Sequence, residues 1–245
     1  MNNVREADID AFGGRAMVVF IKDGWAIGFA YYDGSSWSRG TVEPPALPTK
    51  FEDPSVTHVT AMVGSVATVV FLCVYKTGGQ VYARRFDESS GTWGSRITVA
   101  NLGGVGVDKP WVIAGAAAGP SGPQNAHVAF FDTSMNLWSS FSTDGGSSWT
   151  TQMVIEPGSI SPKGLRTGFC AQPAIGDISL SGPHSYYIAV TPPSGSLMRW
   201  KIVEAIDVAT PPNPPDWQFG YLSTGTANLE MEGLGVVNDQ IHIPG

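Results

Sequence analysis

Apolar residues occur in short runs along the chain, and a polar or glycine-rich turn closes each run. Val66–Tyr75 is one of the longest runs, and it is far shorter than a membrane span. Valine, aromatic residues, serine and threonine concentrate in these segments, while glycine and proline are frequent between them. Short runs separated by turn residues are typical of strands rather than helices. The pattern therefore predicts an all-β protein.

A repeat organises these runs, and three tryptophans spaced 56 residues apart mark it. Each tryptophan ends a polar turn that begins with aspartate: Asp33–Trp37, Asp87–Trp93 and Asp144–Trp149. A second marker keeps the same phase, because a proline opens an apolar run at Pro54, Pro110 and Pro173. Self-similarity at a period of roughly 40–60 residues, with about four strands in each period, is typical of β-propeller blades.

We therefore predict a β-propeller of four-stranded antiparallel blades that forms a single domain over residues 1–245. The blades are expected at 6–45, 52–100, 108–156 and 171–223, followed by a partial blade at 228–245. The first, innermost strands are expected at Ile9–Phe12, Pro54–Val63, Pro110–Ala116 and Pro173–Leu180. The last strand of the second blade is expected as one run, Trp93–Val99.

About four and a half blades do not close a ring, and an open propeller exposes sheet edges that favour association. Three explanations remain open. The N-terminal residues close a five-bladed ring, the chain is part of a six- or seven-bladed ring, or self-association with a second chain completes the ring.

The turn Ser142–Trp149 reads Ser-Thr-Asp-Gly-Gly-Ser-Ser-Trp and fits the pattern Ser-x-Asp-x-Gly-x-Thr-Trp, with serine in the threonine position. In this motif the chain resembles the Asp-box propellers, or bacterial neuraminidase repeat proteins, which include sialidases and non-enzymatic relatives. A carboxylate there can accept hydrogen bonds from turn amides, and glycine tolerates positive φ. The resemblance implies a structural role, away from the ligand site, for Ser142, Asp144, Gly146 and Trp149 and for the related Asp33 and Asp87.

Ligands of propellers usually meet the end of the channel where the innermost strands begin. The candidate ligand-binding residues at these positions are Asp53, Asp108, Lys109, Trp111, Arg166 and Glu230. An aromatic ring with nearby carboxylates and a guanidinium suits a saccharide, because the ring covers an apolar sugar face and the charged groups bind hydroxyls. The alternative is packing between blades for Trp111 and turn formation for Asp53 and Asp108.

Sialidase chemistry, which the resemblance implies for part of that family, needs three arginines, an acid/base aspartate and a tyrosine nucleophile with a glutamate partner. No Arg-Ile-Pro triplet precedes the first blade, and Arg5 and Arg15 are the only early arginines. No tyrosine matches the family pattern, so no catalytic residue is assigned. The four histidines, His58, His127, His184 and His242, show no metal-ligand spacing, and no metal or cofactor is expected.

Composition excludes further classes of partner. The formal net charge of -7 and the absence of lysine and arginine clusters argue against nucleic-acid binding. Cys73 and Cys170 are expected to be buried thiols. No membrane span is expected, and the mature chain is expected to be soluble, with secretion after removal of a leader left open.

Three hypotheses follow for function. The first is a lectin-like propeller that binds a glycan or glycoconjugate. The second is an exo-acting sialidase-like glycoside hydrolase or a fragment of one. The third is a structural or protein-interaction propeller.

Overall fold

The computed structural model describes residues 4–45, 50–117, 123–134 and 136–154, and then the strand segments 167–169, 184–190, 199–207, 217–223, 235–237 and 240–242. Within these residues the chain is all-β, apart from one turn of 3-10 helix, η1 (Asp23–Trp25). No helix in the described residues is long and apolar enough to cross a membrane. The predicted fold class is confirmed.

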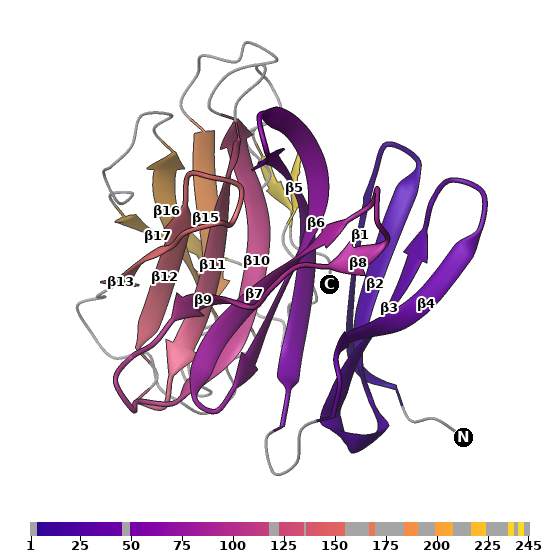
Figure 1. The fold of residues 1–245 in the computed structure, drawn as a ribbon. Coiled ribbons are helices and arrows are strands. Elements are labelled where there is room, and N and C mark those ends of the chain that lie inside the picture. Colours follow the sequence, from indigo (N-terminus) through magenta and orange to yellow (C-terminus); the bar gives the residue numbers. More distant parts are fainter. Residues whose placement is uncertain are drawn as a thin grey trace.

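The described strands form four successive antiparallel sheets (Figure 1). The first contains β1 (Arg5–Phe12), β2 (Arg15–Lys22), β3 (Ala26–Tyr32) and β4 (Trp37–Glu43). The second contains β5 (Glu52–Val63), β6 (Val66–Thr77), β7 (Gln80–Asp87), β8 (Thr92–Trp93) and β9 (Ile97–Ala100). The third contains β10 (Val107–Ala117), β11 (Gln124–Asp132), β12 (Leu137–Ser142) and β13 (Thr150–Val154).

The fourth sheet contains β14 (Thr167–Phe169), β15 (His184–Val190), β16 (Arg199–Asp207) and β17 (Trp217–Ser223). A further pair, β18 (Gly235–Val237) and β19 (Gln240–His242), stands at the position of the expected partial blade. In every four-stranded sheet the strands follow one another in chain order, so each blade is an up-and-down meander. The single domain, the number of blades in the ring and its completion stay predictions.

One strand prediction is wrong, and another falls outside the described residues. In the described residues the strand that pairs with β15 is β14, at Thr167–Phe169, and the predicted strand Pro173–Leu180 lies outside them. Strands β5 and β10 begin before their proline markers. Proline itself lacks the N–H that a ladder needs, but the residues before it can still pair. The expected single strand Trp93–Val99 is divided into β8 and β9, which both pair with β7.

The second sheet is buried on both faces, which explains the unbroken apolar run of β6. Alternate residues of β6 pack to opposite sides, since Phe71, Cys73 and Tyr75 join the core shared with the first sheet. Val70, Leu72 and Val74 join the core shared with the third sheet. A strand between two sheets has no solvent face, so its sequence has no polar alternation.

The innermost strands lie next to one another. Strand β5 contacts both β1 and β10, and β10 contacts β14 and β15 of the fourth sheet. Figure 1 shows the indigo first sheet and the orange fourth sheet at opposite sides of the view. On the first sheet, Val4, Ile9 and Phe12 are exposed.

Candidate functional site

The candidate ligand-binding residues that the structure describes lie at the end of the sheets where the innermost strands begin, which we call the strand-start end. Strands β1, β5 and β10 are irregular there, and each has a register shift near its first residues. At the shifts the backbone adopts positive φ at Glu6 (46°), Asp53 (50°) and Lys109 (48°). Non-glycine residues rarely adopt this conformation, and such strained positions tend to cluster at binding sites.

These strained residues connect neighbouring blades. The Asp53 N–H donates to Glu6 Oε2 at 2.9 Å, and the Lys109 N–H donates to Asp53 Oδ2 at 3.3 Å. The bulged residue of one blade therefore accepts a hydrogen bond from the equivalent residue of the next. Because Lys109 has no carboxylate, this pattern ends at the third blade among the described residues.

A second row of bonds lies two residues further along each strand. Asp8 Oδ2 accepts the Val56 N–H and the Ser55 hydroxyl, both at 2.9 Å. Ser55 in turn accepts the Val112 N–H at 3.3 Å. Burial raises the pKa of Asp8, although these hydrogen bonds oppose the shift. Trp111 occupies the position equivalent to Asp8 and Ser55, so the third blade presents a half-buried indole where the others present a polar side chain.

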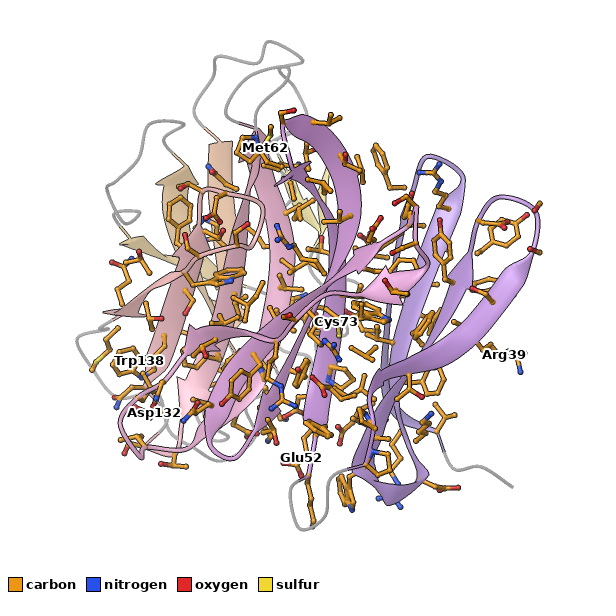
Figure 2. All side chains as sticks on the ribbon, viewed as in Figure 1. Arg39, Glu52, Met62, Cys73, Asp132 and Trp138 are labelled. Carbon is orange, nitrogen blue, oxygen red and sulfur yellow. The ribbon has the colours of Figure 1, made fainter. Side chains whose placement is uncertain are left out.

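Lys76, at the end of β6, joins three carboxylates at the strand-start end. Its ammonium lies 2.8 Å from Asp53 Oδ2 and 3.7 Å from Glu52 Oε2, and it also contacts Asp108 Oδ1. We call Glu52, Asp53, Lys76 and Asp108 the Lys76 cluster. Figure 2 labels Glu52 at the lower tip of the second sheet.

The Lys76 cluster has more carboxylates than its one ammonium can neutralise. Burial alone would lower the pKa of Lys76, but its hydrogen bonds to Asp108 and Asp53 outweigh burial and raise that pKa. The side chain of Lys76 is 17% exposed, whereas that of Asp108 is 45% exposed. One ammonium for three carboxylates leaves acceptor oxygens facing solvent, which can accept hydrogen bonds from hydroxyl groups.

The structure thus brings together Asp53, Asp108 and the backbone of Lys109, three of the predicted ligand-binding residues. Trp111 lies on the same strand, and Arg166 and Glu230 lie outside the described residues. The sequence analysis missed Lys76. It could have been found from the pairing of Glu52 with Lys76, since the end of the second strand must lie opposite the start of the first.

Beneath the Lys76 cluster lies a buried charged network that the sequence analysis also missed. Glu43 Oε1 and Oε2 accept hydrogen bonds from Arg96 at 3.1 and 3.0 Å, and the Tyr75 hydroxyl donates to Glu43. Burial raises the pKa of Tyr75, and the hydrogen bond to Glu43 adds to the rise. Because Tyr75 is 0% exposed, this tyrosine–glutamate pair is closed to substrate.

The opposite end of the sheets, which we call the Asp-turn end, contains the three aspartate turns. Asp144 Oδ1 accepts the N–H groups of Ser147 and Ser148 at 2.8 and 2.9 Å. The Gly146 N–H donates to the Ser142 hydroxyl at 2.8 Å, and the Trp149 indole donates to the Gly146 carbonyl. These bonds connect the turn internally.

The turns of the first two blades repeat the aspartate acceptor of this arrangement. Asp33 Oδ1 accepts the N–H groups of Ser35 and Ser36, and the bond from Ser36 is the main cause that lowers the pKa of Asp33 to about 2. The Ser89 hydroxyl donates to Asp87, which lowers the pKa of Asp87. Low carboxyl pKa values keep these acceptors ionised at neutral pH.

The histidines do not form a metal site in the described part of the chain, where no group of three or more His, Cys, Asp or Glu side chains is placed to hold an ion. His127 is buried, and burial lowers its pKa to about 3. His58 Nδ1 contacts Asp10 Oδ2 at 2.6 Å and stacks on Phe12. Cys73 is a free, buried thiol, as expected, and Cys170 lies outside the described residues.

No family model matches the chain, and no curated protein matches it. Solved structures do match. The SapL1 lectin in complex with α-methyl fucoside has a TM-score of 0.52 and 17% identity, over 89% of this chain and 63% of that chain. An Aleuria aurantia lectin variant in complex with α-methyl-L-fucoside has a TM-score of 0.52 and 17% identity, over 94% and 65% of the two chains.

A third match is a variant of AofleA from Arthrobotrys oligospora in which three arginines are replaced by alanine. It has a TM-score of 0.51 and 17% identity, over 91% of this chain and 60% of that chain. The chain thus spans less than two thirds of the length of these proteins. The likeness shows the fold, so the chain is a β-propeller of the architecture found in these lectins.

Proposed function

We propose that the protein is a lectin-like β-propeller that binds carbohydrate at the strand-start end of its second and third blades. The Lys76 cluster is the observation that supports this proposal most directly. It places exposed carboxylate oxygens beside the strained backbone of Asp53 and Lys109, with Trp111 two residues further along β10. Vicinal sugar hydroxyls suit the carboxylates, and an indole suits the apolar face of a pyranose ring.

The similar propellers were solved with fucosides bound, which makes α-L-fucosides the first ligands to test. We include Arg166 and Glu230 among the proposed binding residues on their sequence positions alone. For Ser142, Asp144, Gly146 and Trp149 we propose a structural role, because their polar groups are engaged with one another inside the turn. The relation to Asp-box sialidases remains part of this proposal.

A glycan array followed by titration calorimetry with methyl α-L-fucoside tests the proposal. Trp111→Ala should weaken binding by about tenfold, the loss expected when one stacking contact is removed. Trp37→Ala is the matched control, because Trp37 is an exposed tryptophan at the Asp-turn end and should leave affinity unchanged.

Three outcomes would contradict the proposal. The first is the absence of any glycan ligand for the folded protein. The second is binding that Trp111→Ala and Asp108→Asn both leave intact. The third is turnover of a fluorogenic sialoside, which would replace the lectin hypothesis with the hydrolase hypothesis.

A further inference from the structure

A second group of residues at the strand-start end has a charge opposite to that of the Lys76 cluster. Trp25, at the end of η1, has positive φ (61°), the largest value among the non-glycine residues that the structure describes. A bulky aromatic residue in this conformation is a clear outlier. Two cations lie over its ring, since Lys50 Nζ is 4.5 Å and Arg5 Cζ is 5.6 Å from the ring centroid. We call Arg5, Trp25 and Lys50 the Trp25 cluster.

The Trp25 cluster is held in place through backbone contacts. The Phe51 N–H donates to the Trp25 carbonyl at 3.3 Å, and the Thr77 hydroxyl donates to the Lys50 carbonyl at 2.8 Å. The half-buried indole also packs on the core between the first two sheets. The ring therefore has a fixed position, while Arg5 and Lys50 are exposed residues.

Among the described residues, no carboxylate forms an ion pair with Arg5 or Lys50. Within the described residues, every ion pair of a lysine or arginine involves Arg15, Lys76, Arg84 or Arg96. Lys76 takes up the nearby Glu52 and Asp53, so Arg5 and Lys50 keep their charge available. Two cations beside a half-buried aromatic ring can bind an anionic group while the exposed part of the ring contacts an adjoining apolar surface.

We propose that the Trp25 cluster is a subsite for an anionic sugar, in which Arg5 and Lys50 bind a carboxylate or sulfate group and Trp25 contacts the pyranose ring. This inference rests on the proposed carbohydrate-binding function and adds a ligand class to it. The Lys76 cluster has an excess of carboxylates, so it accepts hydrogen bonds from hydroxyl groups and repels anions. The Trp25 cluster has two cations, so it attracts anions. The two sites together favour a saccharide with one neutral and one acidic unit.

The test compares two sugars that differ by one carboxylate, methyl β-D-glucuronide and methyl β-D-glucoside, by titration calorimetry on the intact chain. The glucuronide should bind the wild type about tenfold more tightly, and the preference should shrink as salt is added. Lys50→Gln and Arg5→Gln should each remove most of that preference. Arg39→Gln removes an exposed arginine on β4, far from Glu52 in Figure 2, and should leave the preference unchanged.

The outcomes separate this inference from the proposed function. If methyl α-L-fucoside binds but the glucuronide has no advantage over the glucoside, the anionic subsite is wrong and the lectin proposal stands. If inorganic sulfate competes as strongly as the glucuronide, the site binds anions without a sugar, and the inference is again overturned. If no saccharide binds the folded wild type, the proposed function fails as well.

Discussion

The two ends of the sheets differ in which residues adopt positive φ. At the Asp-turn end, every described residue with positive φ is a glycine, among them Gly64, Gly145 and Gly146. At the strand-start end, positive φ also occurs at Glu6, Trp25, Asp53 and Lys109. Glycine adopts this backbone without strain, whereas an L-residue does so at a cost of about 1 kcal/mol or more.

The two ends also differ in where their carboxylates accept hydrogen bonds. At the Asp-turn end the aspartates bond within their own turns, so each turn is largely self-contained. At the strand-start end the carboxylates of Glu6, Asp8 and Asp53 accept hydrogen bonds from the next blade. The comparison teaches that the aspartates of the Asp-turn end close their own turns, while the carboxylates of the strand-start end join blades and retain strain and unmatched charge suited to a ligand.

The buried network below the strand-start end should give the largest loss of stability when broken. Glu43→Ala removes the carboxylate that Arg96 and Tyr75 share and leaves the Tyr75 hydroxyl without its acceptor. Breaking a buried charged pair from one side costs about 3–5 kcal/mol, and the lower end of that range applies here because the Arg96 side chain is 41% exposed while Glu43 is buried. Urea denaturation monitored by circular dichroism would measure the change.

The control for this loss lies at the Asp-turn end. Arg15 pairs with Glu88 across the first two blades, and the Arg15 side chain is 47% exposed. Arg15→Ala should therefore cost less than about 1 kcal/mol, as exposed pairs do. Equal losses in the two variants would mean that charged contacts stabilise both ends alike.

Gly145→Ala should be the most damaging glycine substitution at the Asp-turn end. A Cβ on Gly145 would lie 2.6 Å from Ala61 Cα and 2.7 Å from the Thr60 carbonyl oxygen, and φ there is +68°. Backbone atoms cannot move aside as a flexible side chain does, so the clash adds about 1–3 kcal/mol to the conformational cost.

Gly64→Ala measures the cost of positive φ without a steric clash, because φ is +65° and a Cβ would meet nothing within 4 Å. Its expected cost is about 1 kcal/mol. The comparison of ends would be weakened if thermal denaturation showed Gly145→Ala to be no worse than Gly64→Ala.

The residues that repeat were the predictable part of this molecule. The tryptophan and proline spacing predicted the four sheets, because each blade must bury the same apolar positions against its neighbours. The spacing did not predict that β5 and β10 begin before their prolines, since a bulge depends on contacts with the next blade. It also could not assign one role to Asp53, which is at once a strained turn residue, an acceptor between blades and a partner of Lys76.

The proposed functional surface departs from the repeat, which is why its sequence signal was weak. Lys109 and Trp111 stand where the first two blades have acidic or hydroxyl side chains. Among the described residues, Trp25 has no equivalent in the strained residues of the other blades. A periodic pattern identifies what the blades share, whereas the proposed ligand sites consist of residues that occur once.

The smallest expected effect is a pair of opposite pH dependences, one from each end. Burial raises the pKa of Asp8 in the folded protein, so the wild type loses stability as the pH rises from the unfolded value of 3.8 through the folded pKa. Asp8→Asn should therefore gain stability relative to the wild type between pH 3 and pH 7, by about 1 kcal/mol or less. Its amide oxygen can still accept from Val56 and Ser55.

Asp144 should behave in the opposite way. Burial alone would raise its pKa, but hydrogen bonds from Ser148 and Ser142 outweigh burial and lower it. That stabilisation is present above the unfolded pKa and is lost as the pH falls through the folded pKa, so Asp144→Asn should lose stability relative to the wild type as the pH rises from 3 to 7. Denaturation of the wild type and both variants at these two pH values gives the slopes. Two slopes of the same sign would show that the carboxylates at the two ends do not differ as the structure requires, because only a carboxylate that is more acidic when folded stabilises the protein at neutral pH.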